Sequence, residues 1–514
     1  MQKKEPRQTS GRASSVLQNR SVLSVTLTAV LILAIAAVNV FAYALTNLFG
    51  LYFSTPQVQE PLSGSTDAMF ESAISLGEEV TVTFCMDENT LRTHSTGSLV
   101  YQTAKALEER YSDSGFIKIN YVNLITGLDS SNNRVDLEKY KTDMRGNAVS
   151  INASTVIFEC NEQYKVVTDS VTSAGFYPFY TLDGGGAVYA YNGEEVLASM
   201  IAWVLTPDAQ HGTAYMTQNH GETADVSLTT TLACAGYYVD VLNLRQREIP
   251  SDADLVIISA PTADFEQGGD GVHAEIERLD DYLDRGGDLL VIFDPMVKRL
   301  PVFEEFLAER GFRLPSVSEG SFARYLVRES GSSITADGMT FIAEAASDDD
   351  IVAADIFSMM SPFGGSRVLL SRSSYLKLSD GAKPLLTSSS DAVAVAGGKV
   401  YGTEGDYAVA AYNSIVARDG SSYANIAVIP GIYLTSSEAS VTNTYTNKNF
   451  VYATMRVLFD SNAAPLGCKN IMTSTSVLEG LTQDTVRLIT ATVIAIPVVI
   501  AVTGAVILIR RKNR

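Results

Sequence analysis

The sequence predicts an α/β protein that two transmembrane helices anchor in a membrane. Three observations lead to this prediction: an almost uncharged apolar segment near each end of the chain, strands alternating with helices between them, and a parallel βαβ unit at 252–295. An apolar segment of about 20 residues is long enough to cross a bilayer. With 514 residues, the chain is also too long for one ordinary domain.

The βαβ unit is the clearest local pattern. Residues 255–258 form a continuous apolar run, which is typical of a strand buried on both faces, and Pro261 ends it. Helical spacing follows at 273–285, two glycines end that helix, and 289–293 is the next apolar run. A strand, a helix and a strand in this order predict two parallel neighbours joined by a right-handed crossover.

The two ends of the chain carry the membrane signals. The apolar segment 21–48 follows a basic tail at 1–20, and the segment 487–509 precedes a basic tail at 510–514. Because basic residues stay on the cytoplasmic side, we expect both tails in the cytoplasm and residues 49–486 outside it, at the cell membrane. A cleaved signal peptide, whose apolar core is shorter, is the alternative for the first segment.

Net charge narrows the set of ligands. The whole chain carries −20, and the region between the two basic tails is more acidic still. A strongly acidic ectodomain argues against nucleic acid and against anionic lipid as ligands.

Within the ectodomain, we place a first α/β domain at 49–206. Its order of elements, β-α-β-α-β-β-α, resembles the thioredoxin-like layout. Asn192 is expected to begin its last helix in a capping box with Glu195. Cys85 is not part of a C-x-x-C pair, so this domain is a scaffold and not a redox enzyme. The expected strands are 80–84, 117–122, 155–159 and 164–167, and the other expected helices are 98–111 and 136–144.

A second domain is expected at 207–314, where four strands alternate with helices. This alternation predicts a parallel sheet of the flavodoxin or amidotransferase-like kind. The expected strands are 214–216, 238–242, 255–258 and 289–293, and the expected helices are 227–235, 273–285 and 302–309.

The remainder of the ectodomain, 315–486, reads as mixed α/β structure rich in Ser, Gly, Ala and Asp. The acidic run at 348–350 is expected to be a solvated loop. Short β-like runs lie at 366–370, 391–395, 408–411 and 426–429, and a helix is expected at 450–458.

Cysteine and histidine usage predicts no metal site and no cofactor. The four cysteines lie far apart in the sequence, so both buried thiols and one disulfide remain open. The four histidines are scattered singly. The four cysteines are Cys85, Cys160, Cys234 and Cys468, and the histidines are His94, His211, His220 and His273.

Candidate ligand-binding residues follow the predicted parallel strands. Ligands gather at the carboxyl ends of such strands, where the sequence places His220, Glu222, Thr262 and Asp294. A histidine and carboxylates that converge there are suited to acid–base chemistry or to holding a cation. The alternative is that residues 220–222 form a structured turn.

Motifs for catalysis are missing, so we expect no enzyme and no catalytic residue. The sequence contains no G-x-S-x-G elbow, no Walker A loop, no G-x-G-x-x-G and no H-E-x-x-H. After the strand at 255–260 the chain reads Ala-Pro-Thr-Ala, which offers no cysteine and no elbow glycines.

Three blocks of the sequence, the third of which consists of two segments, resemble the GldG-type auxiliary proteins of ABC transport systems. They are Tyr-Asn-Gly-Glu-Glu-Val-Leu-Ala-Ser-Met-Ile (191–201), Gln-Asn-His-Gly-Glu (218–222), Asp-Ala-Asp-Leu-Val-Ile-Ile-Ser-Ala-Pro (252–261) and Tyr-Leu-Asp-Arg-Gly-Gly-Asp-Leu-Leu-Val-Ile-Phe-Asp-Pro (282–295). Asn219 stands where glycine is usual in that family. The resemblance implies an accessory membrane subunit that works beside separate ATPase and permease subunits.

The leading hypothesis is therefore a non-enzymatic accessory component of an ABC-type export complex. Its ectodomain would bind a partner protein or transported material. One alternative is an extracytoplasmic binding protein for a saccharide or envelope polymer, which would use His220, Glu222 and Asp294. The other is a degenerate hydrolase that uses the same residues.

Overall fold

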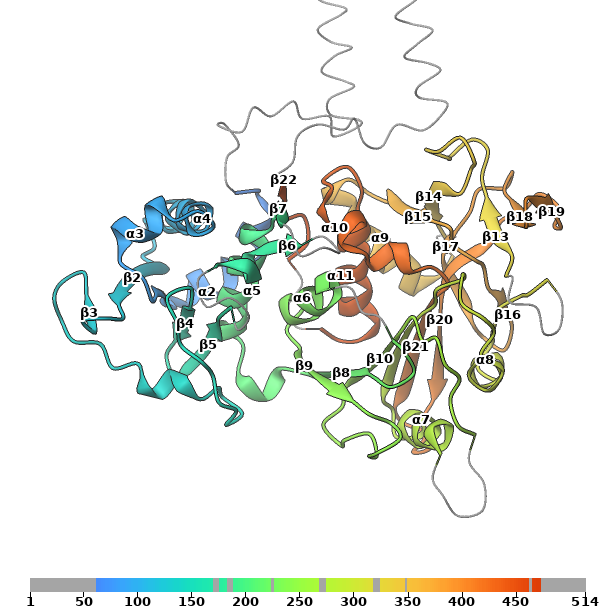
Figure 1. The fold of residues 1–514 in the computed structure, drawn as a ribbon, viewed down its shortest axis with the longest axis horizontal. Coiled ribbons are helices and arrows are strands. Elements are labelled where there is room, and N and C mark those ends of the chain that lie inside the picture. Colours follow the sequence, from blue (N-terminus) through green and yellow to red (C-terminus); the bar gives the residue numbers. More distant parts are fainter. Residues whose placement is uncertain are drawn as a thin grey trace, which may run out of the picture. The chain divides into compact units, whose positions relative to one another are not determined.

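A computed structural model describes residues 62–169, 175–182, 188–222, 226–267, 274–317, 324–346, 349–461 and 465–472. These residues belong to one compact unit with a mixed α/β fold (Figure 1). The predicted membrane segments 21–48 and 487–509, with their basic tails, lie outside the described residues. Within the part that is described, no helix is long and apolar enough to span a membrane.

The first sheet has five strands in the order β3-β2-β1-β4-β5. β1 runs parallel to β2 and antiparallel to β4, and β4 runs antiparallel to β5, so the expected strands of this region are confirmed. The expected helix at 136–144 is wrong, because only the 3-10 turn Glu138–Lys141 forms there. The strands are β1 Val80–Phe84, β2 Ile117–Asn123, β3 Leu128–Asp129, β4 Val156–Cys160 and β5 Gln163–Val167. The helices in this part are α2 Ser65–Leu76, α3 Glu88–Thr93, α4 Gly97–Arg110 and α5 Gly193–Leu205.

The second sheet has nine strands in the order β15-β14-β17-β20-β21-β11-β10-β8-β9. The run from β9 to β21 is parallel, which confirms the predicted parallel sheet, and β21 adds a strand that lies late in the chain. From β21 to β15 the neighbours are antiparallel. The strands are β8 Thr213–Thr217, β9 Tyr238–Leu242, β10 Leu255–Ser259, β11 Asp288–Ile292, β14 Thr340–Ala345, β15 Val368–Ser371, β17 Lys383–Thr387, β20 Ala408–Val416 and β21 Tyr423–Ile429.

The helices and small sheets complete the fold. The further helices are α6 Val226–Cys234, α7 Glu275–Asp284, α8 Pro301–Ala308, α9 Ile351–Met360, α10 Ser437–Val441 and α11 Asn447–Leu458. Three small sheets join β12 Phe312–Arg313 with β16 Lys377–Leu378, β13 Leu326–Arg328 with β18 Val393–Ala396 and β19 Lys399–Val400, and β6 Tyr180–Leu182 with β7 Val188–Tyr191 and β22 Ile471–Met472.

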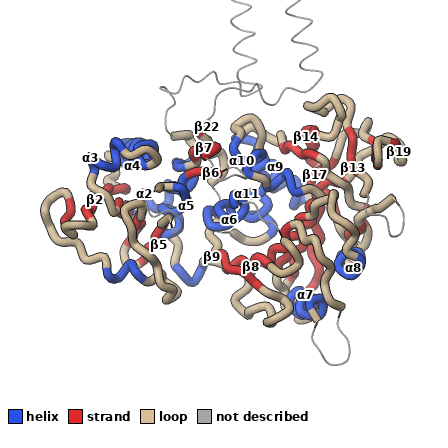
Figure 2. Tube along the Cα trace, in the orientation of Figure 1, coloured by secondary structure: helices blue, strands red, loops and turns tan. Residues whose placement is uncertain are grey.

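Helices cover both faces of the parallel strands (Figure 2). In β10, Leu255 and Ile257 belong to one apolar cluster together with side chains of α6, whereas Val256 and Ile258 belong to a second cluster with side chains of α7 and α8. Because successive side chains of a strand point to opposite faces, only a strand covered on both sides can be apolar at every position.

The capping box expected at the start of α5 does not form. The side chain of Asn192 makes no capping hydrogen bond. The carboxylate of Glu195, which is 2% exposed, instead accepts hydrogen bonds from Lys448 Nζ (2.6 Å) and from the hydroxyl of Tyr452. A buried carboxylate is stabilised more strongly by a cation than by a backbone N–H, so the tertiary partner displaces the local one.

The acidic run at 348–350 was expected to be a solvated loop, and the structure describes its last two residues, 349 and 350. Asp350 is the N-cap of α9 and accepts a hydrogen bond from Ala353 N (3.0 Å). Its other contacts are with Lys383 Nζ (2.6 Å) and the hydroxyl of Tyr412 (2.8 Å). The last aspartate of the run therefore fixes a helix against β17 and β20.

The two ends of the described chain meet at the first turn of α5. The carboxylate of Glu194 accepts hydrogen bonds from Ser63 N (2.6 Å), Ser63 Oγ (2.7 Å) and Lys469 N (3.3 Å). β22 pairs with β7 immediately beside this turn. Residues 62–65 and 465–472 therefore lie side by side in the fold.

The four cysteines are free thiols in this structure, so the disulfide that the sequence left open does not form. Three of them are buried, and Cys468 is partly buried. Free cysteine in such surroundings behaves as a small apolar side chain.

Candidate functional site at the carboxyl edge of the parallel sheet

The parallel strands bring three of the four candidate residues together. His220 and Glu222 follow β8, and Thr262 follows β10, which is the neighbouring strand. The carbonyl oxygen of His220 accepts hydrogen bonds from Thr262 N (2.7 Å) and Ala263 N (2.8 Å). Among the described residues, no hydrogen bond joins Asp294 to the other three candidates. Its Oδ1 accepts the N–H of Met296 instead (2.8 Å).

The turn at 219–222 depends on left-handed backbone. Asn219 has φ +85° and Gly221 has φ +69°. A Cβ at position 221 would lie 2.1 Å from Thr262 Oγ1, so glycine is required both by the backbone and by the close approach of the neighbouring loop. Asparagine tolerates left-handed backbone better than most residues, so Asn219 can adopt this φ without being a glycine.

His220 lies between two carboxylates. Its Nδ1 is 2.9 Å from Glu222 Oε1, and its Nε2 is 2.9 Å from Glu275 Oε1. Glu222 Oε2 also accepts the backbone N–H of His220 (2.6 Å). The imidazole stacks on the ring of Phe265, with 3.9 Å between centroids and 10° between planes, and it is 0% exposed.

Glu275 is the member of this cluster that sequence reasoning missed, because residues 273–277 read as ordinary surface helix. It begins α7, is 1% exposed, and accepts the N–H of Glu266 at Oε2 (2.8 Å). Arg245 Nε lies 3.4 Å from Glu275 Oε1 and supplies a second positive charge. One sequence signal could have indicated Glu275: it is an acidic residue in the first turn of a helix that follows the edge of the sheet.

The two carboxylates keep His220 protonated. Burial alone lowers the pKa of His220, but the hydrogen bonds to Glu222 and Glu275 outweigh it and raise the pKa to about 9. Burial raises the pKa of each glutamate, yet the hydrogen bond to His220, backbone hydrogen bonds and the charge of the imidazolium together outweigh it and lower the pKa of both. The cluster is therefore an imidazolium held by two carboxylates at neutral pH.

This arrangement limits the chemistry of the site. A protonated imidazole with both N–H groups engaged has no lone pair with which to accept a proton or bind a metal. Within the described ranges, no group of three or more His, Cys, Asp or Glu residues could hold a metal ion. The three side chains act as a closed ion cluster that ties the β8 turn to α7.

The turn after β10 has the strained backbone of a nucleophile-bearing turn but carries no nucleophile. Ala260 follows the last residue of β10 and has φ +49°, although alanine rarely adopts left-handed backbone. Hydrolases built on such sheets place their nucleophile on a strained turn of this kind. Here the side chain is a methyl group that is 1% exposed, so it supplies no nucleophile.

The solved structures compared below resemble this chain distantly. No family model and no curated protein matches the chain. Among solved structures, the mmIFT52 N-terminal domain is 15% identical over 48% of this chain and 97% of its own, with a TM-score of 0.35. A putative ThuA-like protein from Bacteroides uniformis is 12% identical over 50% of this chain and 95% of its own, with a TM-score of 0.31. PurLQS from Thermotoga maritima is 13% identical over 47% of this chain and 97% of its own, with a TM-score of 0.27. At these scores, no fold or function is transferred to this chain.

Proposed function

We propose that this chain is a non-enzymatic accessory subunit of an ABC-type export system. Two helices, at 21–48 and 487–509, hold it in the cell membrane with both termini in the cytoplasm. The acidic domain between them lies outside and binds a partner protein or transported material. In this proposal the first sheet is a thioredoxin-like scaffold, and the parallel strands form an amidotransferase-like domain.

The observation that carries the proposal is the meeting of the two chain ends. A protein with two membrane helices and one external domain needs both connections to leave the domain on its membrane side. Ser63 and Lys469 bind the same carboxylate of Glu194, so the connections to both apolar segments start from one place in the fold. This geometry suits a two-pass anchor.

The candidate site supports the absence of catalysis. His220 has both ring nitrogens engaged by carboxylates and is fully buried, and the turn after β10 carries alanine where a nucleophile would stand. The chain also lacks a Walker A loop, so ATP hydrolysis would be done by a separate subunit. The resemblance to the GldG-type proteins points to the same division of labour.

Co-purification tests the partners. The full chain, tagged and extracted in detergent from its native cells, is expected to bring down an ATPase with a Walker A loop and a multi-span permease, identified by mass spectrometry. A tagged two-span membrane protein of unrelated sequence serves as the control. Recovery of this chain alone, in a detergent that preserves other transporter complexes, would overturn the proposal.

Labelling in intact cells tests the topology separately. A membrane-impermeant maleimide is expected to label Asp113→Cys, because Asp113 is exposed in the described domain, and to leave Ser10→Cys, in the first basic tail, unlabelled until the membrane is opened. The native chain is the control for background labelling. Labelling of Ser10→Cys in intact cells would contradict the proposed orientation.

A further inference from the structure

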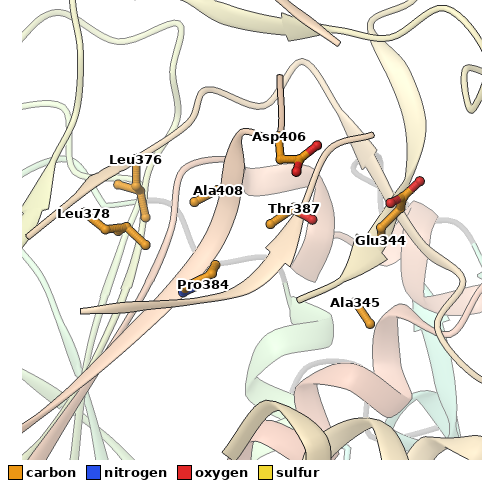
Figure 3. A pocket seen from close by; sticks show the side chains of 8 residues that line it. All are labelled: Glu344, Ala345, Leu376, Leu378, Pro384, Thr387, Asp406 and Ala408. Atoms are coloured by element: carbon orange, nitrogen blue, oxygen red, sulfur yellow. The ribbon is translucent and has the colours of Figure 1, made fainter. Parts of the chain in front are cut away.

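A hollow of about 540 Å³ lies on the antiparallel half of the nine-stranded sheet, away from the His220 cluster in strand order. Apolar side chains line one side, and two carboxylates and a threonine line the other (Figure 3). The apolar side includes Leu376, Leu378 and Pro384, and the polar side consists of Glu344, Thr387 and Asp406. Binding sites of this size typically combine an apolar wall with a few polar groups.

The carboxylates of this hollow have no cation of their own. Among the described residues, no Lys or Arg nitrogen lies within 4.0 Å of Glu344 or Asp406, and both side chains are exposed. Lys383, the basic residue of the adjoining strand β17, forms an ion pair with Asp350 instead (2.6 Å). The negative charge at the rim is therefore free to attract a cation from outside.

Two further carboxylates, those of Glu329 and Asp391, add negative charge near Glu344. Glu329 is 3% exposed, and its carboxylate accepts hydrogen bonds only from Ser389 N (2.7 Å) and Ser389 Oγ (2.5 Å) among the described residues. Burial raises the pKa of Glu344, and the neighbouring Glu329, Asp406 and Asp391 raise it further. A cation bound at this place would relieve the repulsion between these groups.

We propose that this hollow is the docking site for a basic side chain, arginine or lysine, presented by an apolar segment of a partner protein. The aliphatic stem of such a side chain would lie along Leu378 and Pro384, and its charged end would reach Glu344 and Asp406. Because the carboxylates are exposed, the hollow encloses too little of a free small molecule. A side chain that protrudes from a larger interface fits it better. The site is independent of the membrane topology and of the export function proposed above.

A peptide pair tests this docking site. The full chain, in nanodiscs of neutral phospholipid, is titrated with an octapeptide that carries one arginine between two leucines and with the same peptide carrying neutral citrulline instead. The arginine peptide is expected to bind more tightly by a factor of up to about thirty, since the two exposed charge pairs contribute at most about 1 kcal/mol each. Equal binding of the two peptides would overturn the proposal.

Variants locate the binding. Glu344→Gln/Asp406→Asn is expected to abolish the preference for arginine, whereas Asp113→Asn/Glu162→Gln, which removes two exposed carboxylates elsewhere, preserves it. Leu378→Ser is expected to weaken the binding of both peptides by a similar factor, because it removes part of the apolar wall. A preference that survives in Glu344→Gln/Asp406→Asn would show that the arginine binds elsewhere and would refute the assignment.

Discussion

The Sγ atom of Cys468 lies 3.7 Å from the Oγ atom of Ser65, although 403 positions separate the two residues. This contact joins the two ends of the described chain beside the buried carboxylate of Glu194. It also offers a direct chemical test of the arrangement, because a cysteine at position 65 would stand close to a native thiol.

Ser65→Cys is expected to form a disulfide with Cys468 under mild oxidation. The bond would close nearly the whole domain into one loop, and disulfides typically add about 2–4 kcal/mol to the free energy of unfolding. Non-reducing electrophoresis would show a faster band that reducing agent removes. The band of the double variant Ser65→Cys/Cys468→Ser should keep its mobility. A faster band in that variant would mean that the introduced cysteine pairs with another thiol.

His220→Gln is expected to destabilise the protein by about 3–5 kcal/mol, because it leaves two buried carboxylates without their shared cation. Urea unfolding measures the effect. Adding Glu222→Gln and Glu275→Gln to this variant should restore part of the loss. If His220→Gln left stability unchanged, the closed ion cluster would not be the role of this histidine.

The contribution of His220 to stability should depend on pH. Its pKa is raised from 6.5 to about 9, so its contribution is full below pH 6.5 and is lost as pH rises through 9. The lowered pKa values of Glu222 and Glu275 make their contribution full above pH 4.5. The difference in unfolding free energy between the native chain and His220→Gln should therefore be largest between pH 4.5 and 6.5. A difference that grows toward pH 9 would be incompatible with this cluster.

The fluorescence of Trp203, the single tryptophan of the chain, should report the protonation of Lys165. Lys165 Nζ lies 3.5 Å from the centre of the Trp203 ring, and burial lowers the pKa of this lysine to about 8. A change in emission with a midpoint near pH 8 is expected, because the cation–π contact is lost when the amine becomes neutral.

The other groups around Lys165 should not produce a fluorescence change near pH 8. Burial lowers the pKa of His211 and raises those of Tyr238 and Cys234 well above 8. The remaining charged neighbours are Asp143, Arg145 and Asp208. Lys165→Arg, which stays charged, and Lys165→Met, which is neutral, should both give flat profiles. A midpoint near pH 8 in either variant would assign the change to another group.

Gly221→Ala is expected to cost more than a substitution at an open turn glycine. Gly127 has nearly the same φ, +68°, but no atom lies within 4 Å of a Cβ there, whereas at Gly221 the Cβ meets Thr262 Oγ1. Left-handed backbone alone costs about 1 kcal/mol, so Gly127→Ala measures this part and the excess at position 221 measures the contact. Equal melting temperatures for the two variants would show that the Thr262 loop moves away freely.

Much of the fold could be predicted from local pattern. The strands β8, β9, β10 and β11 were predicted as members of one parallel sheet, because short apolar runs alternate with helical segments, although β10 follows β9 without a helix between them. The antiparallel half of the same sheet was less clear, and β14 and β17 were missed. β14 (Thr-Phe-Ile-Ala-Glu-Ala) is short and alternates only weakly, and β17 contains Pro384, which argues against a strand inside a sheet. The pairing of such strands is set by neighbours far away in the sequence.

The sequence by itself determined the class of the protein: an α/β domain, a parallel sheet and the residues that follow its strands. Only the tertiary structure decided what those residues do. It placed Glu275 against His220, gave Glu195 to Lys448 and Tyr452 in place of the local cap, and brought Ser65 to Cys468. Periodicity and turn chemistry depend on residues that are close in the sequence. A buried charge instead needs an oppositely charged or hydrogen-bonding partner that is close in space, and no local sequence pattern encodes which residue that will be.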